Sequence, residues 1–320
     1  MSTPHTSVDI LTVGESLGLV VMEDIGPLAT ADRARLRFGG AESNVAIAAT
    51  RLGATVAWVS RLGTDGLGDK IERTLRGEGV EVRVRRDPHR ATGLMIKERR
   101  TSTSTQVHYY RSSSAASALE PEDIPNEWVQ NARLVHVTGI TSALSPSARE
   151  TVRSVMQCAH EVGVAVSLDL NYRSGLWSTA EASAEYITLL PFVDLLFGGL
   201  DELQLVGSHI DSAAATGYLR DQFGVDQVIV KEGALGATVV SAHGIQTCPA
   251  YTVQVDDTVG AGDAFVAGYL TAWLQGQSID QCLDRGTRAG ALACTVPGDW
   301  EGAPLLSELA LLDSSEPVKR

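Results

Sequence analysis

Short apolar runs alternate with helical patterns along almost the whole chain, and this rhythm limits the fold more than any other feature. The strand-like runs lie at 8–15, 55–60, 134–139, 163–171, 193–199 and 226–233. Helical patterns occur between them, at 43–53, 65–79 and 147–162. Apolar residues fill the strand runs without alternation, which is typical of parallel strands that are covered on both faces. We therefore predict an α/β fold with a mostly parallel sheet between helices.

Two stretches interrupt the strand–helix rhythm. Residues 17–38 and 91–111 alternate polar and apolar side chains, as β-hairpins do. We predict that they form a small second sheet that projects from the core as a lid. The predicted division is a core of residues 1–14, 39–90 and 112–320, and a lid of residues 15–38 and 91–111.

Composition excludes several classes of protein. The 320 residues are 44% hydrophobic and carry a formal net charge of −13, so the chain is neither disordered nor basic enough to bind nucleic acid. No apolar run has the length of a transmembrane helix, and the first residues lack the apolar core of a signal peptide. The four cysteines show no metal-binding spacing: Cys158, Cys248, Cys282 and Cys294. We predict a cytoplasmic protein with no membrane or nucleic-acid partner.

The run TVGAGDAFVAGYL (258–270) carries the clearest local chemistry. Apolar residues recur at helical spacing after Gly262, so the small residues Gly260, Ala261 and Gly262 start a buried helix. The free N–H groups of such a helix start attract an anion, and small residues let a phosphate come close. Asp263 fits a base that takes a proton from a hydroxyl attacking phosphorus. The same spacing equally fits an acid that only favours the helix start, so both interpretations stay open.

Other site signals are weaker or missing. The chain has no GxxxxGK[ST], no GxGxxG after a strand, no HExxH and no GxSxG. Four residues do fall at the carboxyl ends of the predicted parallel strands: Glu15, Asp169, Asn171 and Gly199. Ligands of parallel sheets bind beyond these strand ends, so we predict the site there.

Two segments resemble the signatures of the ribokinase-like (PfkB) family of sugar kinases. DTVGAGDAF (257–265) is similar to its C-terminal signature, and FGGAESNVAIAATRLG (38–53) with SRLGTDGLGDKI (60–71) is similar to its N-terminal one. The resemblance covers nearly the whole chain. It implies a three-layer αβα sandwich with a β-sheet lid, in agreement with the strand pattern. It also implies ATP and Mg²⁺ as cofactors and leaves a monovalent cation open.

The resemblance implies a role for individual residues. Asp263 matches the catalytic base, and Gly260, Ala261 and Gly262 match the anion hole for the transferring phosphate. Positions that grip sugar hydroxyls are matched by Gly39, Gly40 and Asn44, although a tight turn before a helix cap has the same pattern. The run KEGALGA (231–237) matches the nucleotide loop, with Lys231, Gly233 and Gly236, although an ordinary strand-to-hairpin turn fits it too. Glu202 matches the acid that organises Mg²⁺ through water, and Asp257 is a second candidate near the metal.

Three further segments resemble 2-keto-3-deoxygluconate kinases within that family: VHYYR (107–111), DLNYRSGLW (169–177) and TVPGDWEGAP (295–304). Arginine binds a sugar-acid carboxylate through two parallel hydrogen bonds, so Arg111 and Arg173 are the predicted carboxylate contacts. Neighbours on a strand point to opposite faces, and the resemblance favours Tyr109 over Tyr110 as a substrate contact. The predicted reaction is phosphorylation of the primary hydroxyl of 2-keto-3-deoxygluconate to its 6-phosphate.

The chain also departs from the family pattern. Gly199 stands where an Asn is usual, Met95 stands where sugar-acid kinases often have Tyr, and an Asn of the late helix is missing from 285–293. A kinase for a neutral sugar of the fructose or ribose type is therefore the first alternative, and a catalytically weak sugar-acid sensor is the second. A third, an NAD-dependent oxidoreductase, is weakened by the missing dinucleotide fingerprint. We expect a homodimer or larger homo-oligomer that pairs through the apolar lid face.

Overall fold

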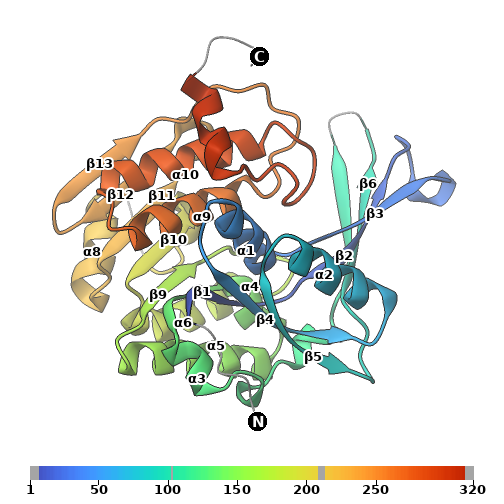
Figure 1. Ribbon diagram of the computed structural model, residues 1–320, viewed down its shortest axis with the longest axis horizontal. Helices are drawn as coiled ribbons and strands as arrows, with labels where there is room; N and C mark the ends of the chain where they lie inside the picture. The colour runs from blue at the N-terminus through green and yellow to red at the C-terminus, as the bar shows by residue number, and fades with distance from the viewer. Residues whose placement is uncertain (1–6, 102–103, 208–212, 314–320) are drawn as a thin grey trace.

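The central sheet of the computed structural model, which describes residues 7–101, 104–207 and 213–313, is nine-stranded (Figure 1). Its strand order is β13-β12-β11-β10-β9-β8-β1-β4-β5. The strands are β1 (Val8–Val13), β4 (Val56–Gly63), β5 (Glu81–Asp87), β8 (Ala132–Thr138), β9 (Ala165–Asp169), β10 (Leu195–Gly199), β11 (Gln227–Lys231), β12 (Ala237–Ser241) and β13 (Gly244–Cys248). All neighbours from β5 to β11 pair in parallel, whereas β12 and β13 pair antiparallel. The predicted mostly parallel sheet is confirmed.

Helices cover both faces of this sheet (Figure 1). One face packs against α1 (Ala41–Arg51), α2 (Gly66–Gly77), α9 (Ala261–Leu274) and α10 (Ile279–Ala293). The other packs against α3 (Asn126–Gln130), α4 (Gly139–Leu144), α5 (Pro146–Glu161), α6 (Thr179–Leu189), α7 (Leu200–Leu203) and α8 (Ala213–Phe223). Successive strand residues serve opposite layers: Leu195 and Phe197 pack toward α9, and Leu196 packs toward α5. The predicted three-layer sandwich is confirmed.

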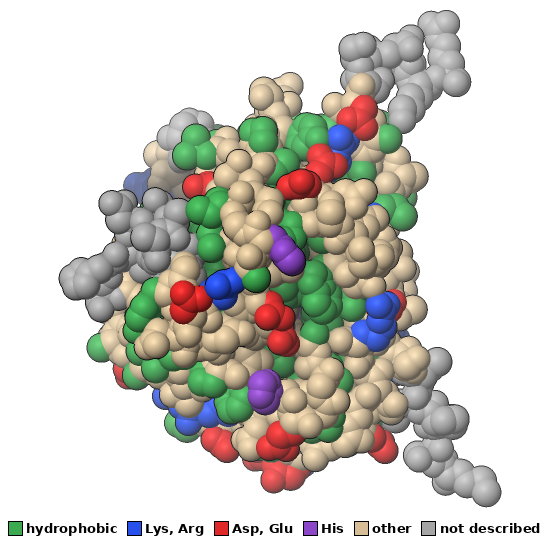
Figure 2. Space-filling view, turned by 90° about the vertical axis from the view of Figure 1, so that its left-hand side faces the viewer, with side chains coloured by type: hydrophobic (Ala, Val, Ile, Leu, Met, Phe, Trp, Pro, Cys, Tyr) green, Lys and Arg blue, Asp and Glu red, His purple; other side chains and the backbone are tan. Residues whose placement is uncertain are grey.

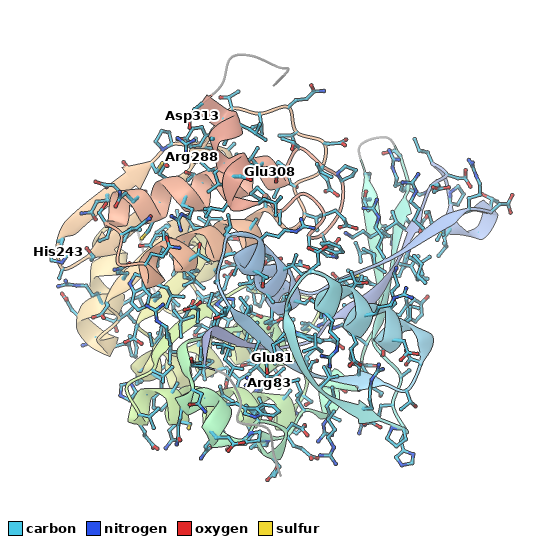
Figure 3. The ribbon with its side chains drawn as sticks, viewed as in Figure 1. Glu81, Arg83, His243, Arg288, Glu308 and Asp313 are labelled. Carbon is cyan, nitrogen blue, oxygen red and sulfur yellow. The ribbon has the colours of Figure 1, made fainter. Side chains whose placement is uncertain are left out.

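Short 3₁₀ helices complete the described chain: η1 (Leu28–Thr30), η2 (Ala116–Ala118), η3 (Pro121–Asp123), η4 (Leu190–Phe192), η5 (Gly233–Leu235) and η6 (Leu306–Asp313). Arg288 of α10 fastens η6, because it pairs with Asp313 at 2.8 Å and with Asp284 of its own helix at 2.8 Å (Figure 3). His243 lies at the distant β12–β13 turn (Figure 3). No helix in the described part of the chain is both long and apolar enough to span a membrane.

The second sheet has four strands in the order β3-β2-β6-β7 and stands apart from the sandwich (Figure 1). Its strands are β2 (Leu17–Met22), β3 (Ala34–Gly39), β6 (Leu94–Arg99) and β7 (Thr105–Tyr110). Strands β2 and β3 form one antiparallel pair, β6 and β7 form another, and β2 joins them by pairing in parallel with β6. All four lie in the two stretches assigned to a small sheet, except that β3 runs one residue further, to Gly39. We call this sheet the lid.

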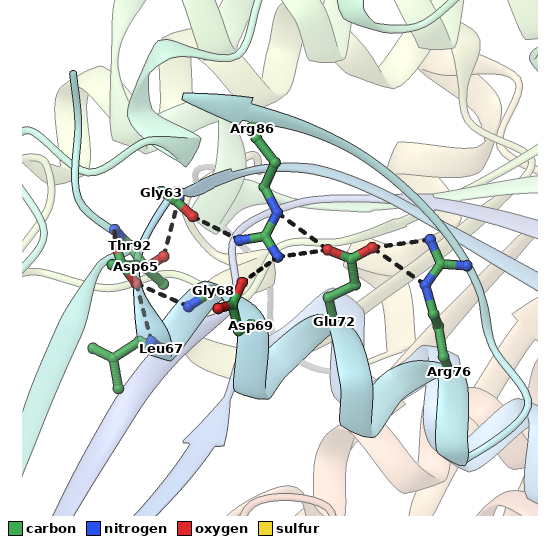
Figure 4. A network of polar contacts seen from close by, with 9 residues as sticks. All are labelled: Gly63, Asp65, Leu67, Gly68, Asp69, Glu72, Arg76, Arg86 and Thr92. Atoms are coloured by element: carbon green, nitrogen blue, oxygen red, sulfur yellow. Dashed lines mark hydrogen bonds and ion pairs between the residues drawn. The ribbon is translucent and has the colours of Figure 1, made fainter. Parts of the chain in front are cut away.

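A polar network fixes the root of the lid to the core (Figure 4). One carboxylate oxygen of Asp65 caps α2, accepting from the N–H groups of Leu67 and Gly68 at 3.0 and 2.9 Å. The other oxygen accepts from the N–H of Thr92, just before β6, at 2.8 Å. Arg86 donates to the carbonyl of Gly63 at 2.7 Å and pairs with two acids of α2. The start of the second lid hairpin is thereby tied to β4, β5 and α2.

The face on the side of β13 shows Lys and Arg scattered singly among acidic and apolar side chains (Figure 2).

Candidate active site

A cleft of about 920 Å³ opens between the lid and the carboxyl ends of the parallel strands. Core residues that line it follow consecutive strands: Glu15 after β1, Asn171 after β9, Glu202 after β10 and Lys231 at the end of β11. Lid residues such as Met95 line the opposite wall. The cleft therefore lies at the edge of the sheet where the sequence placed a site.

A second cavity of about 510 Å³ lies on the other side of the start of α9. Gly233 and Gly236, from the predicted nucleotide loop, line it together with apolar residues such as Phe265. Three residues line both cavities: Thr258, Lys231 and Gly262. A group that passes from one cavity to the other must therefore pass the N-terminus of α9.

The first turn of α9 lets other atoms come close to its backbone. Its N-cap, Gly260, has a φ of 75°, a left-handed conformation that favours glycine. A Cβ at Gly260 would also lie 1.8 Å from the carbonyl oxygen of Asp299. The first N–H groups of an α-helix have no partner within the helix, so this turn presents donors where the two cavities meet. The predicted anion hole, Gly260 to Gly262, thus occupies the junction.

Asp263 sits directly behind these donors and lines the cleft. Its Oδ2 accepts a hydrogen bond from Nδ2 of Asn44 on α1 at 2.8 Å. Burial raises the pKa of Asp263 from 3.8 to about 7; Asp169 adds to the rise, whereas the Asn44 hydrogen bond, Lys231 and Arg173 oppose it. A carboxyl group that titrates near neutrality suits a general base, because it can hold a proton and release it again.

The turn before α1 places its backbone in the wall of the cleft. A Cβ at Gly40 would lie 2.2 Å from the carbonyl oxygen of Glu15, and one at Gly39 would lie 2.2 Å from Oδ2 of Asp299. Both glycines and Asn44 line the cleft. The Oδ1 of Asn44 accepts weakly from the N–H of Gly40, at 3.4 Å. The side-chain oxygen of Asn44 is thus hydrogen-bonded to this turn, and its side-chain nitrogen is hydrogen-bonded to Asp263.

Of the described residues, four cationic side chains line the cleft: Lys97, Arg111, Arg173 and Lys231. Three of them pair with a buried carboxylate: Lys97 with Asp299 at 2.5 Å, Arg111 with Glu15 at 2.5 Å, and Lys231 with Asp169 at 2.7 Å. Arg173 donates to the carbonyl of Tyr172 at 3.0 Å and has no carboxylate partner in the part of the chain described. Its charge is the one most available to an anionic ligand.

Arg111 was expected to contact a substrate carboxylate, and the structure gives it a second task. Its guanidinium pairs with Glu15 and lies 5.6 Å from the ring centre of Tyr109. The other oxygen of Glu15 accepts from the hydroxyl of Ser114. Tyr109 lines the cleft, whereas Tyr110 is absent from its walls. The choice of Tyr109 over Tyr110 therefore fits the strand geometry.

Glu202 is the candidate metal contact in the cleft. It accepts backbone hydrogen bonds from Gly199 and Tyr172, both at 2.8 Å, the second made possible by a left-handed turn at Asn171 with a φ of 43°. Burial and the nearby Asp169 raise its pKa. The described residues contain no group of three His, Cys, Asp or Glu side chains that could hold a metal. One fixed carboxylate suits a Mg²⁺ ion that is bound mainly through water and phosphate oxygens.

Asp257 lines neither cavity. Its two oxygens accept from the N–H groups of Val259 and Gly298, at 3.1 and 3.3 Å. Its role near the metal stays a prediction.

Sequence analysis did not place three of the charged side chains near the site: Glu42, Lys97 and Asp299. It placed Asp169 at the strand ends without a role. Lys97 lies two residues from Met95, so strand alternation could have placed it on the cleft face. Glu42 is fully buried in the first turn of α1, where it accepts from the hydroxyls of Thr138 and Thr141. Its burial raises its pKa to about 7. Nothing local in the sequence indicates these partners.

Comparison with known proteins identifies the family. Residues 9–305 match the family described as pfkB family carbohydrate kinase. The chain is 35% identical to a 2-dehydro-3-deoxygluconokinase of Bacillus subtilis, over 97% of this chain and 96% of that protein. It is 34% identical to a 2-dehydro-3-deoxygalactonokinase of Haloferax volcanii, over 92% and 93%.

Solved structures agree. A 2-dehydro-3-deoxygluconokinase from Thermotoga maritima superposes with a TM-score of 0.88 at 26% identity, covering 96% of this chain and 98% of that one. A fructokinase from Xylella fastidiosa with bound ATP gives a TM-score of 0.84 at 27% identity, covering 95% and 97%. The chain belongs to the pfkB family of carbohydrate kinases.

Proposed function

We propose that this protein is an ATP-dependent sugar-acid kinase that phosphorylates the primary hydroxyl of 2-keto-3-deoxygluconate or of its galactonate isomer. The observation that carries the proposal is the position of Asp263, a half-buried acid that lines the cleft, is held by Asn44 and directly follows Gly262, which lines both cavities. The names of the two relatives support the substrate class.

In the proposed reaction the larger cleft holds the sugar acid and the smaller cavity holds the nucleotide. Asp263 accepts the hydroxyl proton while the hydroxyl oxygen forms a bond to the γ-phosphorus. The bond from that phosphorus to the bridging oxygen breaks, and ADP leaves with the electron pair. The first N–H groups of α9 stabilise the charge on the transferred group. A Mg²⁺ ion near Glu202 would neutralise phosphate charge.

Arg173 is the proposed contact for the substrate carboxylate, because its charge is not taken up by an acid of the protein. Arg111 then acts mainly through Glu15, which it orients in the wall of the cleft. The lid covers the cleft and keeps water away from the phosphorus.

We also propose a homodimer, a cytoplasmic location and a test for a monovalent cation. The outer face of the lid exposes Leu36 and Tyr110, which supports pairing of two lids in a homodimer. Four free thiols support a reducing cytoplasmic setting. Dependence on a monovalent cation stays a prediction, to be checked by replacing K⁺ in the assay buffer.

ADP release with Mg-ATP tests the function against 2-keto-3-deoxygluconate, 2-keto-3-deoxygalactonate, gluconate, fructose and ribose. We expect turnover on the keto-deoxy acids only. Asp263→Asn should lower kcat about 10²–10⁴-fold. Arg173→Ala should raise the KM for the acid by about 10–100-fold, as expected for a lost charge-assisted hydrogen bond. Asp280→Asn, at an exposed position at the start of α10, is the matched control.

Turnover on fructose or ribose that does not depend on Arg173 would show that the substrate is a neutral sugar and not a sugar acid. The protein would still be a kinase. Tight binding of one acid without any turnover would instead favour the sensor.

A further inference from the structure

The two sides of the larger cleft differ in polarity. The core side presents hydrogen-bonding side chains, such as Asn44 and Asp263. The lid side presents three apolar side chains, Leu17 of β2, Met95 of β6 and Val107 of β7, which we call the apolar patch. None of these three side chains carries an N–H or O–H group. A ligand in the cleft therefore meets donors on the core side and a surface of side chains without donors at the patch.

Strand register explains why the patch is continuous. Met95 lies opposite Leu19 of β2, and Lys97, on the same face of β6 as Met95, lies opposite Val107. Leu17 and Leu19 share a face of β2, because residues two apart on a strand point the same way. Leu17, Leu19 and Met95 form one buried cluster, against which Val107 packs.

Close packing holds the patch in place. A Cβ at Gly93 would lie 2.3 Å from Cδ2 of Leu17, so the missing side chain of Gly93 leaves room for Leu17. Leu19 is fully buried, and Leu17 and Met95 are 4% and 6% exposed. Side chains packed in this way do not turn aside to make room for a polar group.

The charged lid side chains beside the patch already have partners. Lys97 pairs with Asp299 at 2.5 Å, and Arg111 pairs with Glu15 at 2.5 Å. Tyr109 borders the patch and carries the remaining side-chain donor among the described lid residues in the cleft. The centre of the patch therefore offers a ligand hydroxyl no side-chain partner.

Met95 also departs from the family pattern, since sugar-acid kinases often have Tyr at this position. A Tyr would add a hydroxyl to the lid side of the cleft, whereas Met adds none. A ligand hydroxyl placed against the patch would lose its water and gain no partner, which is unfavourable. In an apolar pocket, one added hydroxyl lowers kcat/KM by about 10²-fold. The patch therefore favours a ligand whose facing carbon carries no hydroxyl.

We propose that the apolar patch is a specificity determinant that contacts the deoxy carbon of the substrate, with Met95 as its central residue. The inference rests on the proposed function and deepens it. Asp263 binds the reacting hydroxyl at one end and Arg173 the carboxylate at the other, so the carbons between them lie along the cleft. The third carbon of 2-keto-3-deoxygluconate is a methylene group, which contacts the patch without losing a hydrogen bond. In 2-ketogluconate the same carbon carries a hydroxyl.

A cleft too narrow for any added atom is the competing explanation. It predicts that Met95→Gln keeps the preference for the deoxy acid, because Gln is about as large as Met. The patch predicts that Met95→Gln loses the preference, because the amide offers the hydroxyl a partner. Met95→Leu, which changes the shape and stays apolar, should keep it.

The test compares kcat/KM for 2-keto-3-deoxygluconate and 2-ketogluconate, which differ by one hydroxyl, in the full chain. The parent should prefer the deoxy acid by about 10²-fold. Met95→Gln and the nearly isosteric Val107→Thr should each lower this ratio to below about tenfold, and Met95→Leu should keep it within about threefold of the parent. Ile96→Gln is the matched control, because Ile96 points to the other face of β6 and does not line the cleft.

Calorimetric titration without ATP separates this inference from the proposed function. It measures the same preference as a ratio of dissociation constants, so it needs no turnover. If the parent binds these acids and phosphorylates neither, the proposed function fails, and the ratio in Met95→Gln still judges the patch. If the parent acts on neutral sugars instead, the comparison uses 2-deoxyribose and ribose, and the patch predicts a preference for the deoxy sugar.

Two results would overturn the role of the patch. One is a parent that accepts the hydroxylated ligand within about threefold of the deoxy ligand, far below the expected discrimination. The other is a preference that stays at the parent's value in both Met95→Gln and Val107→Thr, which would leave the narrow cleft as the explanation.

Discussion

At the scale of single residues, Asp263 combines partial burial with one directed hydrogen bond. Burial raises its pKa, and the Asn44 amide lowers it again. A general base must be ionised to act, so its protonation sets the acid side of the rate profile.

The first prediction is a pH dependence. The kcat/KM of the parent should fall tenfold per pH unit below about pH 7, as Asp263 becomes protonated. Asn44→Ala should move this fall to higher pH, because it removes the hydrogen bond that favours the ionised form. Initial rates between pH 5 and 9 measure both, and an unchanged midpoint in the variant would contradict the assignment.

The second prediction concerns stability, and its sign follows from the same carboxyl. The pKa of Asp263 is higher in the folded protein than in the unfolded one, so the folded state binds the extra proton between pH 4 and 7. Stability is therefore lost as the pH rises through this window, by up to about 4 kcal/mol. Asp263→Asn should unfold at a higher Tm than the parent at pH 8 and at a similar Tm at pH 4. Asp280→Asn should show no such pH dependence.

At the scale of elements, the loop at 297–301 connects the lid to the start of α9. Lys97 of β6 pairs with Asp299, and Arg37 of β3 donates to the carbonyl of Pro297 at 2.7 Å. The backbone of the same Asp299 packs under Gly260. The loop at 297–301 thus contacts both the lid and the start of α9.

The third prediction tests the Lys97–Asp299 ion pair with a double-mutant cycle. Lys97→Met leaves the Asp299 carboxylate buried without its partner and should cost about 3–5 kcal/mol of unfolding free energy. Lys97→Met combined with Asp299→Asn should recover most of that loss, because no buried charge remains unpaired. Urea unfolding of the parent, both single variants and the double variant measures the coupling. Additive losses would show that the pair does not act as a unit.

At the scale of the whole molecule, the lid has two different faces. Leu17, Leu19 and Met95 are buried toward the cleft. On the outer face, Leu36 and Tyr110 are 51% and 60% exposed. A sheet that is covered on one side by its own core presents the other side to a partner.

The fourth prediction is that two lids pair in solution. Light scattering should give a dimer for the parent at micromolar concentration and a monomer for Leu36→Glu, because a buried charge opposes the contact. Ile245→Glu, on the equally exposed edge strand β13, should stay dimeric. A monomeric parent would refute the pairing.

The sequence by itself determined what depends on local pattern. Apolar runs without alternation indicated the parallel strands, alternation indicated the two lid hairpins, and the spacing after Gly262 indicated α9. The family signatures pointed to Asp263, Asn44 and the small residues of the two turns. The strands, the hairpins and α9 follow from backbone periodicity, which acts over a few residues, whereas the roles of Asp263 and Asn44 came from the resemblance alone.

Only the tertiary structure decided which charges meet. Arg111 and Arg173 looked equivalent in the sequence, but Glu15 takes up the charge of Arg111 alone. Asp169 meets Lys231 because their strands flank β10, and Lys97 meets Asp299 across 202 positions of the chain. Such pairs depend on strand order and on how the lid sits over the core. No local pattern encodes that arrangement, because the free energy that sets it comes from packing between distant elements.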